Sequence, residues 1–378
     1  MKGVVFICLV WLFWGPVAGL LFSVRAQPGT PALATALDSL LGANYKANQP
    51  GAALLVMQGE KMLYQRGVGV ANAATRQANT PQTNFRMASV SKQFTAAAVW
   101  LLARQGKLAL DDTLMRFFPG FGAIGRKATL RHLLTHSSGL LDYESLMKRP
   151  ATGQLSDQDV LRMVAPHDSG YFEPGTAFRY SNTGFVLLGL VVEKVTGQSF
   201  AAFMQEHLFR PLSMRETVLY GPGKPIAHRA LGYGRRRNGE FFFSDQSPTS
   251  ATGGDGGVYT SLGDYARWHQ ALDLPGGFAL KPALEAVFYP IQGTGHYYGM
   301  GWFFAKRPDG SYEMFHTGDT CGFSNLVIRI PESGVLVAYF SNIADNPYLL
   351  NDFLRVLKRF PALYPQTDLL EALPGLTR

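Results

Sequence analysis

Cysteine is nearly absent from this chain. Its 378 residues contain two cysteines, Cys8 and Cys321, and Cys8 lies in the N-terminal leader described below. Without the leader one cysteine remains, so the chain can form no internal disulfide, and a disulfide-stabilised fold is excluded. No cysteine-protease pattern surrounds Cys321, and we interpret it as a small buried residue.

Charge is also scarce. Charged residues make up 16% of the chain against 47% hydrophobic residues, and the net charge is +8. This balance fits a globular protein with a large core and gives no indication of a nucleic-acid partner. The one dense basic cluster, 235–237, precedes Asn238-Gly239, a hairpin-turn signal. We interpret it as a solvated turn, with contact to an anionic envelope surface as the alternative.

The N-terminal leader, residues 1–26, has the pattern of a secretory signal peptide. Lys2 supplies the positive start, an apolar run follows from Val4 to Val24, and Val24 and Ala26 are small residues at the usual cleavage positions. Gly15-Pro16 would interrupt a membrane-spanning helix, which favours cleavage. We expect a secreted or periplasmic protein, with membrane association only if the leader stays uncleaved as an anchor.

Signatures of several other enzyme classes are missing. The chain has no G-x-S-x-G turn of α/β-hydrolases and no glycine-rich phosphate loop at a strand–helix junction. His132 and His136 have the spacing of a zinc pair on a helix, but no glutamate follows His132 and no third ligand presents itself. We interpret both as structural histidines and expect no metal and no organic cofactor.

A serine and a lysine open a predicted helix from Ser91 to about Gly106. Ser89 and Lys92 are three residues apart, which places them on one helical face, so the lysine amine can help to remove the serine proton. A serine hydroxyl is a weak nucleophile until a neighbour does this. The alternative is an ordinary helix N-terminus, with Ser89 as its cap and Lys92 in solvent.

Two further motifs support a catalytic role. Tyr180-Ser181-Asn182 brings a phenol that can ionise beside a lysine ammonium and act as general base, or remain a neutral hydrogen-bond donor. Asn182 offers its amide to a substrate carbonyl, or serves as a turn or helix-cap residue. His316-Thr317-Gly318 is small enough to let a substrate lie against a strand edge.

With these motifs in this order, the chain resembles the serine β-lactamase and penicillin-binding superfamily, specifically its class C-like branch. That branch also contains D-alanyl-D-alanine carboxypeptidases, D-aminopeptidases and short-chain esterases. The family motifs are S-x-x-K, Y-x-N and [KH]-[TS]-G. Longer blocks extend the resemblance over roughly residues 50 to 345, namely 85–112, 130–140, 172–200, 256–268 and 298–342.

The resemblance implies an α/β (α+β) fold, an antiparallel sheet flanked by helices with a mostly helical insertion. The α/β lobe would comprise residues of about 27–115 and 255–378, and the helical lobe about 116–254. The motifs would meet at the seam between the lobes, with Ser89 on the α/β lobe, Tyr180 on the helical lobe and His316 on an edge strand.

The resemblance also assigns roles. Ser89, Lys92 and Tyr180 would be catalytic, and the backbone N–H groups of Ser89 and Asp319 would form the oxyanion hole. The substrate-binding residues would be Asn182, His316, Thr317 and Gly318. Many family members have lysine in place of His316; a histidine is mostly neutral near pH 7, so carboxylate binding should be weaker or pH-dependent.

The sequence therefore predicts an exported serine hydrolase that cleaves an amide or ester through an acyl-enzyme. D-amino-acid peptides of the cell-wall type and short-chain esters are equally favoured small-molecule or peptide substrates, with β-lactams third. One alternative is a penicillin-binding or sensor-type protein that acylates without turnover or only holds a ligand. Another is a scaffold anchored by an uncleaved leader. No oligomeric state is predicted.

Overall fold

A computed structural model describes residues 31–148, 153–274, 278–344 and 347–372 of this chain. The predicted signal peptide, 1–26, lies outside these residues. Within them, no single helix is long and apolar enough to cross a membrane, and one pair of helices passes the same test together but is bent by 82°.

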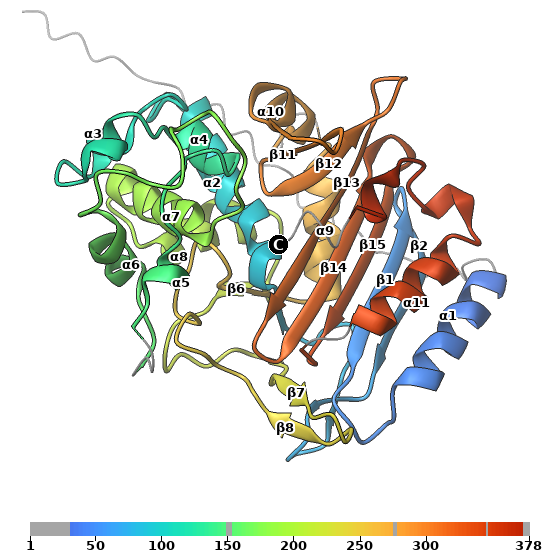
Figure 1. The fold of residues 1–378 in the computed structure, drawn as a ribbon. Coiled ribbons are helices and arrows are strands. Elements are labelled where there is room, and N and C mark those ends of the chain that lie inside the picture. The colour runs from blue at the N-terminus through green and yellow to red at the C-terminus, as the bar shows by residue number, and fades with distance from the viewer. Residues whose placement is uncertain (1–30, 149–152, 275–277, 345–346, 373–378) are drawn as a thin grey trace, which may run out of the picture.

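An eight-stranded antiparallel sheet forms the centre of the molecule (Figure 1). Both ends of the chain contribute to it, in the order β10-β11-β12-β13-β14-β15-β1-β2. The first hairpin, β1 (Ala52–Gln58) and β2 (Lys61–Val68), turns at Gly59-Glu60. The late strands are β10 (Tyr289–Ile291), β11 (His296–Gly299), β12 (Trp302–Lys306), β13 (Tyr312–Thr320), β14 (Phe323–Ile330) and β15 (Val335–Ser341).

Helices cover both faces of this sheet (Figure 1). Helices α1 (Pro31–Asn44) and α11 (Pro347–Leu357) pack together on one face, and α9 (Leu262–Ala271) lies against β1 and β15 on the other. The central strands are therefore shielded from water on both sides, and every residue of β15 is buried. This explains why β1 and β15 are continuous apolar runs rather than alternating patterns.

A second group of helices lies beside the sheet and comes from the middle of the chain (Figure 1). Its longest members are α2 (Lys92–Arg104) and α7 (Asn182–Thr196), which pack against each other. The shorter helices are α3 (Leu114–Phe117), α4 (Leu130–Leu134), α5 (Tyr143–Leu146), α6 (Asp157–Val164), α8 (Phe200–Met204) and, nearer the sheet, α10 (Leu280–Ala286).

Seven short strands outside the large sheet are also present among the described residues. They are β3 (Val70–Asn72), β4 (Gln77–Ala78), β5 (Phe85–Arg86), β6 (Val218–Leu219), β7 (Tyr233–Arg235), β8 (Phe241–Phe243) and β9 (Val258–Thr260). Three of them, β6, β7 and β8, lie in the stretch predicted to be mostly helical. Strands β7 and β8 form the hairpin predicted from Asn238-Gly239. The mixed fold with a large antiparallel sheet is as predicted.

Two details of the sheet differ from the predictions. The apolar pattern of 297–306 predicts one strand, but Met300 and Gly301 have φ of 53° and 79° and turn the chain between β11 and β12. Strand β13 is not an edge strand, because β12 and β14 flank it. However, β12 pairs only with residues 312–315, so from His316 onward β13 is hydrogen-bonded to β14 alone and its other side is open.

Candidate active site

Ser89 lies on a tight turn that precedes helix α2. The turn is a 3₁₀ helix, η1 (Ala88–Ser91), and α2 begins at Lys92, one residue later than predicted. Ala88 has a φ of 47°, in the left-handed region that costs a residue with a Cβ about 1–2 kcal/mol. Strain of this kind persists where the surrounding structure imposes it, and it commonly marks functional sites. Here it sets the direction of the half-buried Ser89 side chain.

The third motif packs directly against this turn. A Cβ on Gly318 would lie 2.1 Å from the Met87 carbonyl oxygen, so only glycine lets β13 approach η1 this closely. The prediction explained the small Thr317-Gly318 pair by room for substrate. The structure adds another reason, since Gly318 brings the open side of β13 against the segment that carries Ser89.

Lys92 links the three parts of the site. Its side chain is fully buried, and its Nζ donates to Ser89 Oγ at 3.0 Å, to Asn182 Oδ1 at 2.7 Å and to the Asp255 carbonyl oxygen at 2.9 Å. These three acceptors match the three N–H donors of an ammonium group. The alternative of a solvated Lys92 at a helix end is therefore wrong.

Tyr180 lies beside Lys92 and keeps its hydroxyl free. The ammonium of Lys92 is 5.0 Å from the centroid of the Tyr180 ring, and the buried Tyr180 hydroxyl has no hydrogen-bond partner among the described residues. The ring is held by aromatic neighbours, with centroid distances of 4.2 Å to His136 and 6.1 Å to Phe303. The site therefore holds a phenol oxygen next to a cation, without a hydrogen-bond partner among the described residues.

Asn182 bridges the site through both ends of its amide. Its Oδ1 accepts from Lys92, and its Nδ2 donates to Glu144 Oε1 at 2.9 Å. It is the first residue of α7, whose N-cap is Ser181, so the helix-cap interpretation of Asn182 is wrong. A substrate carbonyl that takes the Asn182 N–H must share it with, or displace, the exposed Glu144 carboxylate.

His316 is enclosed rather than open to a ligand. It is 1% exposed, its Nδ1 lies 2.6 Å from the Thr317 carbonyl oxygen, and its Nε2 lies 3.2 Å from the Tyr298 hydroxyl. A carbonyl only accepts, so Nδ1 carries the proton and Nε2 accepts from Tyr298. Burial, reinforced by the positive charge of Lys92, lowers the pKa of His316 to about 3. The expectation of pH-dependent carboxylate binding by this ring near neutral pH is therefore wrong.

This buried histidine makes folding sensitive to acid. Its pKa is about 3 in the folded protein against 6.5 in a model peptide, so its contribution to stability is complete above pH 6.5 and is lost as the pH falls toward 3. Between about pH 7.5 and pH 5.0 the unfolding free energy of the wild-type protein should fall. We expect this fall to be smaller in His316→Gln by up to about 2 kcal/mol, because each pKa unit corresponds to 1.36 kcal/mol. Urea titrations at both pH values measure it. An identical drop in the two proteins would contradict it.

Ser89 and Asp319, the expected oxyanion donors, line one pocket. Asn182 and Thr320 line it too, as do two acidic residues that the motifs did not single out, Glu144 and Asp255. Asp255 lies in the glycine-rich stretch 253–257, whose composition predicts a loop and is the only signal for Asp255 in the sequence. Glu144 and Tyr298 had no signal in the sequence, because their contacts to Asn182 and His316 join distant segments.

The two histidines with zinc-like spacing have structural roles. His132 Nδ1 accepts from Thr129 N at 3.3 Å in a capping box at the start of α4. His136 is buried, accepts from Ser181 N at 3.2 Å and packs on Tyr180. Burial lowers the pKa of His136 well below its usual value. Within the described ranges, no group of three or more His, Cys, Asp or Glu residues could hold a metal ion.

Comparison with known proteins decides the family. The family model described as Beta-lactamase matches residues 34–358. The chain belongs to the beta-lactamase family. Penicillin-binding protein 4* of Bacillus subtilis (strain 168) is 32% identical to it over 323 residues, which cover 81% of this chain and 71% of that protein. The resemblance inferred from the motifs is thus confirmed.

Solved structures agree with this placement. A penicillin binding protein from Bacillus halodurans has a TM-score of 0.72 and 28% identity, covering 87% of this chain and 99% of its own. D-amino acid amidase from Ochrobactrum anthropi SV3 has a TM-score of 0.71 and 24% identity, and the match covers 87% of this chain and 98% of the amidase chain. At this identity the similarity shows a shared fold and nothing more. The beta-lactamase-fold relatives are serine hydrolases or acyl transferases, and this chemistry extends to the present member of the family.

Proposed function

We propose that this beta-lactamase family member is an exported hydrolase that cleaves an amide or ester through an acyl-enzyme on Ser89. The observation that carries the proposal is the 3.0 Å contact between Lys92 Nζ and Ser89 Oγ in a pocket that Asn182 and Asp319 also line. Splitting one acyl transfer into two easier steps is the purpose of such a nucleophile.

Tyr180 is the better candidate for the base that takes the serine proton. All three N–H donors of Lys92 already have acceptors, whereas the Tyr180 hydroxyl has none among the described residues. Lys92 then orients Ser89 through its hydrogen bond to the serine oxygen. As the tetrahedral intermediate collapses to the acyl-enzyme, Tyr180 passes the serine proton to the leaving amine or alcohol. In the second step Tyr180 takes a proton from water while the water oxygen attacks the acyl carbon, and it returns that proton to Ser89 Oγ as the acid product leaves.

The oxyanion of each tetrahedral intermediate needs two donors. We assign the backbone N–H groups of Ser89 and Asp319, since both residues line the pocket from opposite segments, η1 and β13. Backbone donors are preorganised and need no rearrangement when charge develops on the oxygen. Gly318 packs against Met87, so the main-chain groups along which an extended substrate can lie are those of β13 at Asp319 and Thr320, which line the pocket.

The names of the relatives support the substrate class. One similar protein is called a penicillin-binding protein and one similar fold a D-amino acid amidase, so D-amino-acid peptides or amides and short-chain esters are the substrates that we propose. The apolar leader, 4–24, supports export, where peptides of the cell-wall type are available. β-Lactams are a weaker proposal, because His316 supplies no cation for their carboxylate.

The first test is hydrolysis of p-nitrophenyl acetate by the purified protein. We expect sustained turnover and, on rapid acid quenching, the mass of an acetyl group on the peptide that contains Ser89. A burst of one equivalent of p-nitrophenol with no later turnover would instead favour the penicillin-binding or sensor function. Parallel assays with D-amino acid amides, D-alanyl-D-alanine peptides and penicillin then rank the substrates, and the N-terminal mass of the exported protein tests leader cleavage.

A further inference from the structure

A buried arginine, Arg86, lines the pocket that contains Ser89. Arg86 ends strand β5, which pairs with β9 and leads directly into the nucleophile turn. It is 2% exposed and lines the same pocket as Ser89. Arg86 and Ser89 are thus three residues apart in the sequence and line one pocket.

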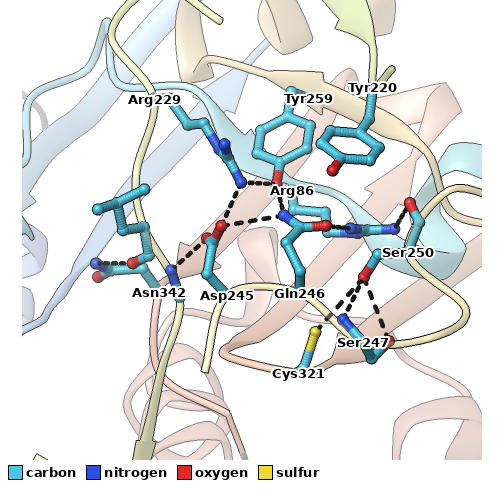
Figure 2. A network of polar contacts seen from close by, with 12 residues as sticks. Arg86, Tyr220, Arg229, Asp245, Gln246, Ser247, Ser250, Tyr259, Cys321 and Asn342 are labelled. Atoms are coloured by element: carbon cyan, nitrogen blue, oxygen red, sulfur yellow. Dashed lines mark hydrogen bonds and ion pairs between the residues drawn. The ribbon is translucent and has the colours of Figure 1, made fainter. Parts of the chain in front are cut away.

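Arg86 has no acidic partner among the described residues, which is unusual for a buried charge. The other deeply buried arginine, Arg329, pairs with Asp273. The neighbouring Arg229 pairs with Asp245. Figure 2 shows both arginines around Gln246, and the carboxylate of Asp245 is turned to Arg229 and not to Arg86.

The guanidinium of Arg86 is held in place by neutral groups. It donates to Gln246 Oε1 at 3.2 Å and to the Ser250 carbonyl oxygen at 2.8 Å, and it lies 5.5 Å from the centroid of the Tyr220 ring (Figure 2). Its Nε is buried without a hydrogen-bond partner among the described residues. The positive charge is thus oriented, but neither neutralised nor fully hydrogen-bonded.

We propose that Arg86 is a carboxylate-binding site for the acyl part of the substrate, an inference that rests on the proposed function. Guanidinium groups bind carboxylates through paired N–H donors, and such charge-assisted bonds are stronger than neutral ones. Thr249, Thr252 and Thr320 also line this pocket. The substrate would carry its carboxylate beyond the scissile carbonyl, so that it reaches Arg86 while Ser89 attacks.

The other residues of the pocket leave the positive charge of Arg86 to decide whether an anionic acyl group is accepted. His316 is buried and bonded to Tyr298 and Thr317, so its ring does not offer a cation to the substrate. Three acidic residues, Glu144, Asp255 and Asp319, also line the pocket and would repel an anion. An anionic acyl group is therefore favoured only where its carboxylate reaches Arg86, which predicts a preference for one chain length.

The test compares two matched sets of esters. One set is the 4-nitrophenyl monoesters of succinic, glutaric and adipic acid, and the other is the neutral 4-nitrophenyl esters of the same chain lengths. Rates with Ser89→Ala are subtracted to remove spontaneous hydrolysis. We expect kcat/KM for one acid monoester to exceed that of its neutral counterpart by about tenfold or more, and Arg86→Met to reduce this ratio by about 10- to 100-fold.

The matched control removes the neighbouring ion pair and leaves the charge of Arg86. The double variant Arg229→Met, Asp245→Asn perturbs the network of Figure 2 without leaving an unpaired charge. It should keep the wild-type ratio between acid and neutral esters. A ratio that falls equally in this control would assign the effect to structural disturbance and overturn the proposal.

Two further measurements test the proposal even if the Arg86→Met variant does not fold or the protein hydrolyses no ester. Wild-type protein that prefers the neutral ester at every chain length would overturn it. Calorimetric titration of adipate into Ser89→Ala protein tests the site when no ester is hydrolysed, and in that case the proposed function fails separately. Adipate binding that disappears in the Ser89→Ala, Arg86→Met variant supports the site, and no binding to either protein overturns it.

Discussion

Replacing Ser89 by alanine is expected to abolish turnover of p-nitrophenyl acetate, with a loss of at least about 10⁴-fold in kcat. The acyl-enzyme cannot form without the hydroxyl, and the remaining donors only bind and polarise the ester. Since Ser89 Oγ receives one hydrogen bond from Lys92 and is half-buried, stability should change by less than about 1.5 kcal/mol. Steady-state kinetics and urea unfolding measure both quantities.

Ser91 provides the matched control on the same turn. Its hydroxyl is buried and accepts from Val258 N at 3.0 Å, so it ties η1 to β9 and has no place in the chemistry. We expect Ser91→Ala to cost about 1–3 kcal/mol of stability, because a buried N–H loses its partner, while kcat changes by only a few-fold. Wild-type-like turnover in Ser89→Ala would refute the acyl-enzyme mechanism.

The second large effect is expected for Tyr180→Phe, with kcat lowered by about 10²–10⁴-fold, the usual contribution of a general base. The stability of this variant should be unchanged or slightly higher. The hydroxyl is buried and has no hydrogen-bond partner among the described residues, so its removal costs folding nothing and relieves a desolvated polar atom. Loss of activity without loss of stability is the signature of a group kept for chemistry.

Tyr298→Phe should give the opposite result. Tyr298 packs 4.4 Å from the centroid of the same His136 ring and donates its hydroxyl to His316 at 3.2 Å. Removing that hydroxyl leaves a buried His316 nitrogen unsatisfied, which costs about 1–3 kcal/mol of stability. Its kcat should fall much less than that of Tyr180→Phe. If Tyr298→Phe loses as much kcat as Tyr180→Phe, the assignment of Tyr180 as the base is contradicted.

The local elements were predictable because their signals lie in contiguous residues. The helix after Ser89 and the hairpin at Asn238-Gly239 each follow from apolar periodicity or turn chemistry. The family followed from three short motifs and the blocks around them. Errors occurred where a long-range contact decides the outcome, as in the turn at Met300, whose positive φ no propensity predicts.

The sequence alone determined the family and predicted the residues to which we assign acyl transfer, because the motifs contain those reactive groups at their characteristic spacing. Only the tertiary structure decided what each group can do. It buried His316 and lowered its pKa to about 3, gave Lys92 three acceptors, and left Arg86 without a counter-ion. Burial, charge pairing and hydrogen-bond satisfaction depend on neighbours that are distant along the chain, so these properties exist only once the chain is folded.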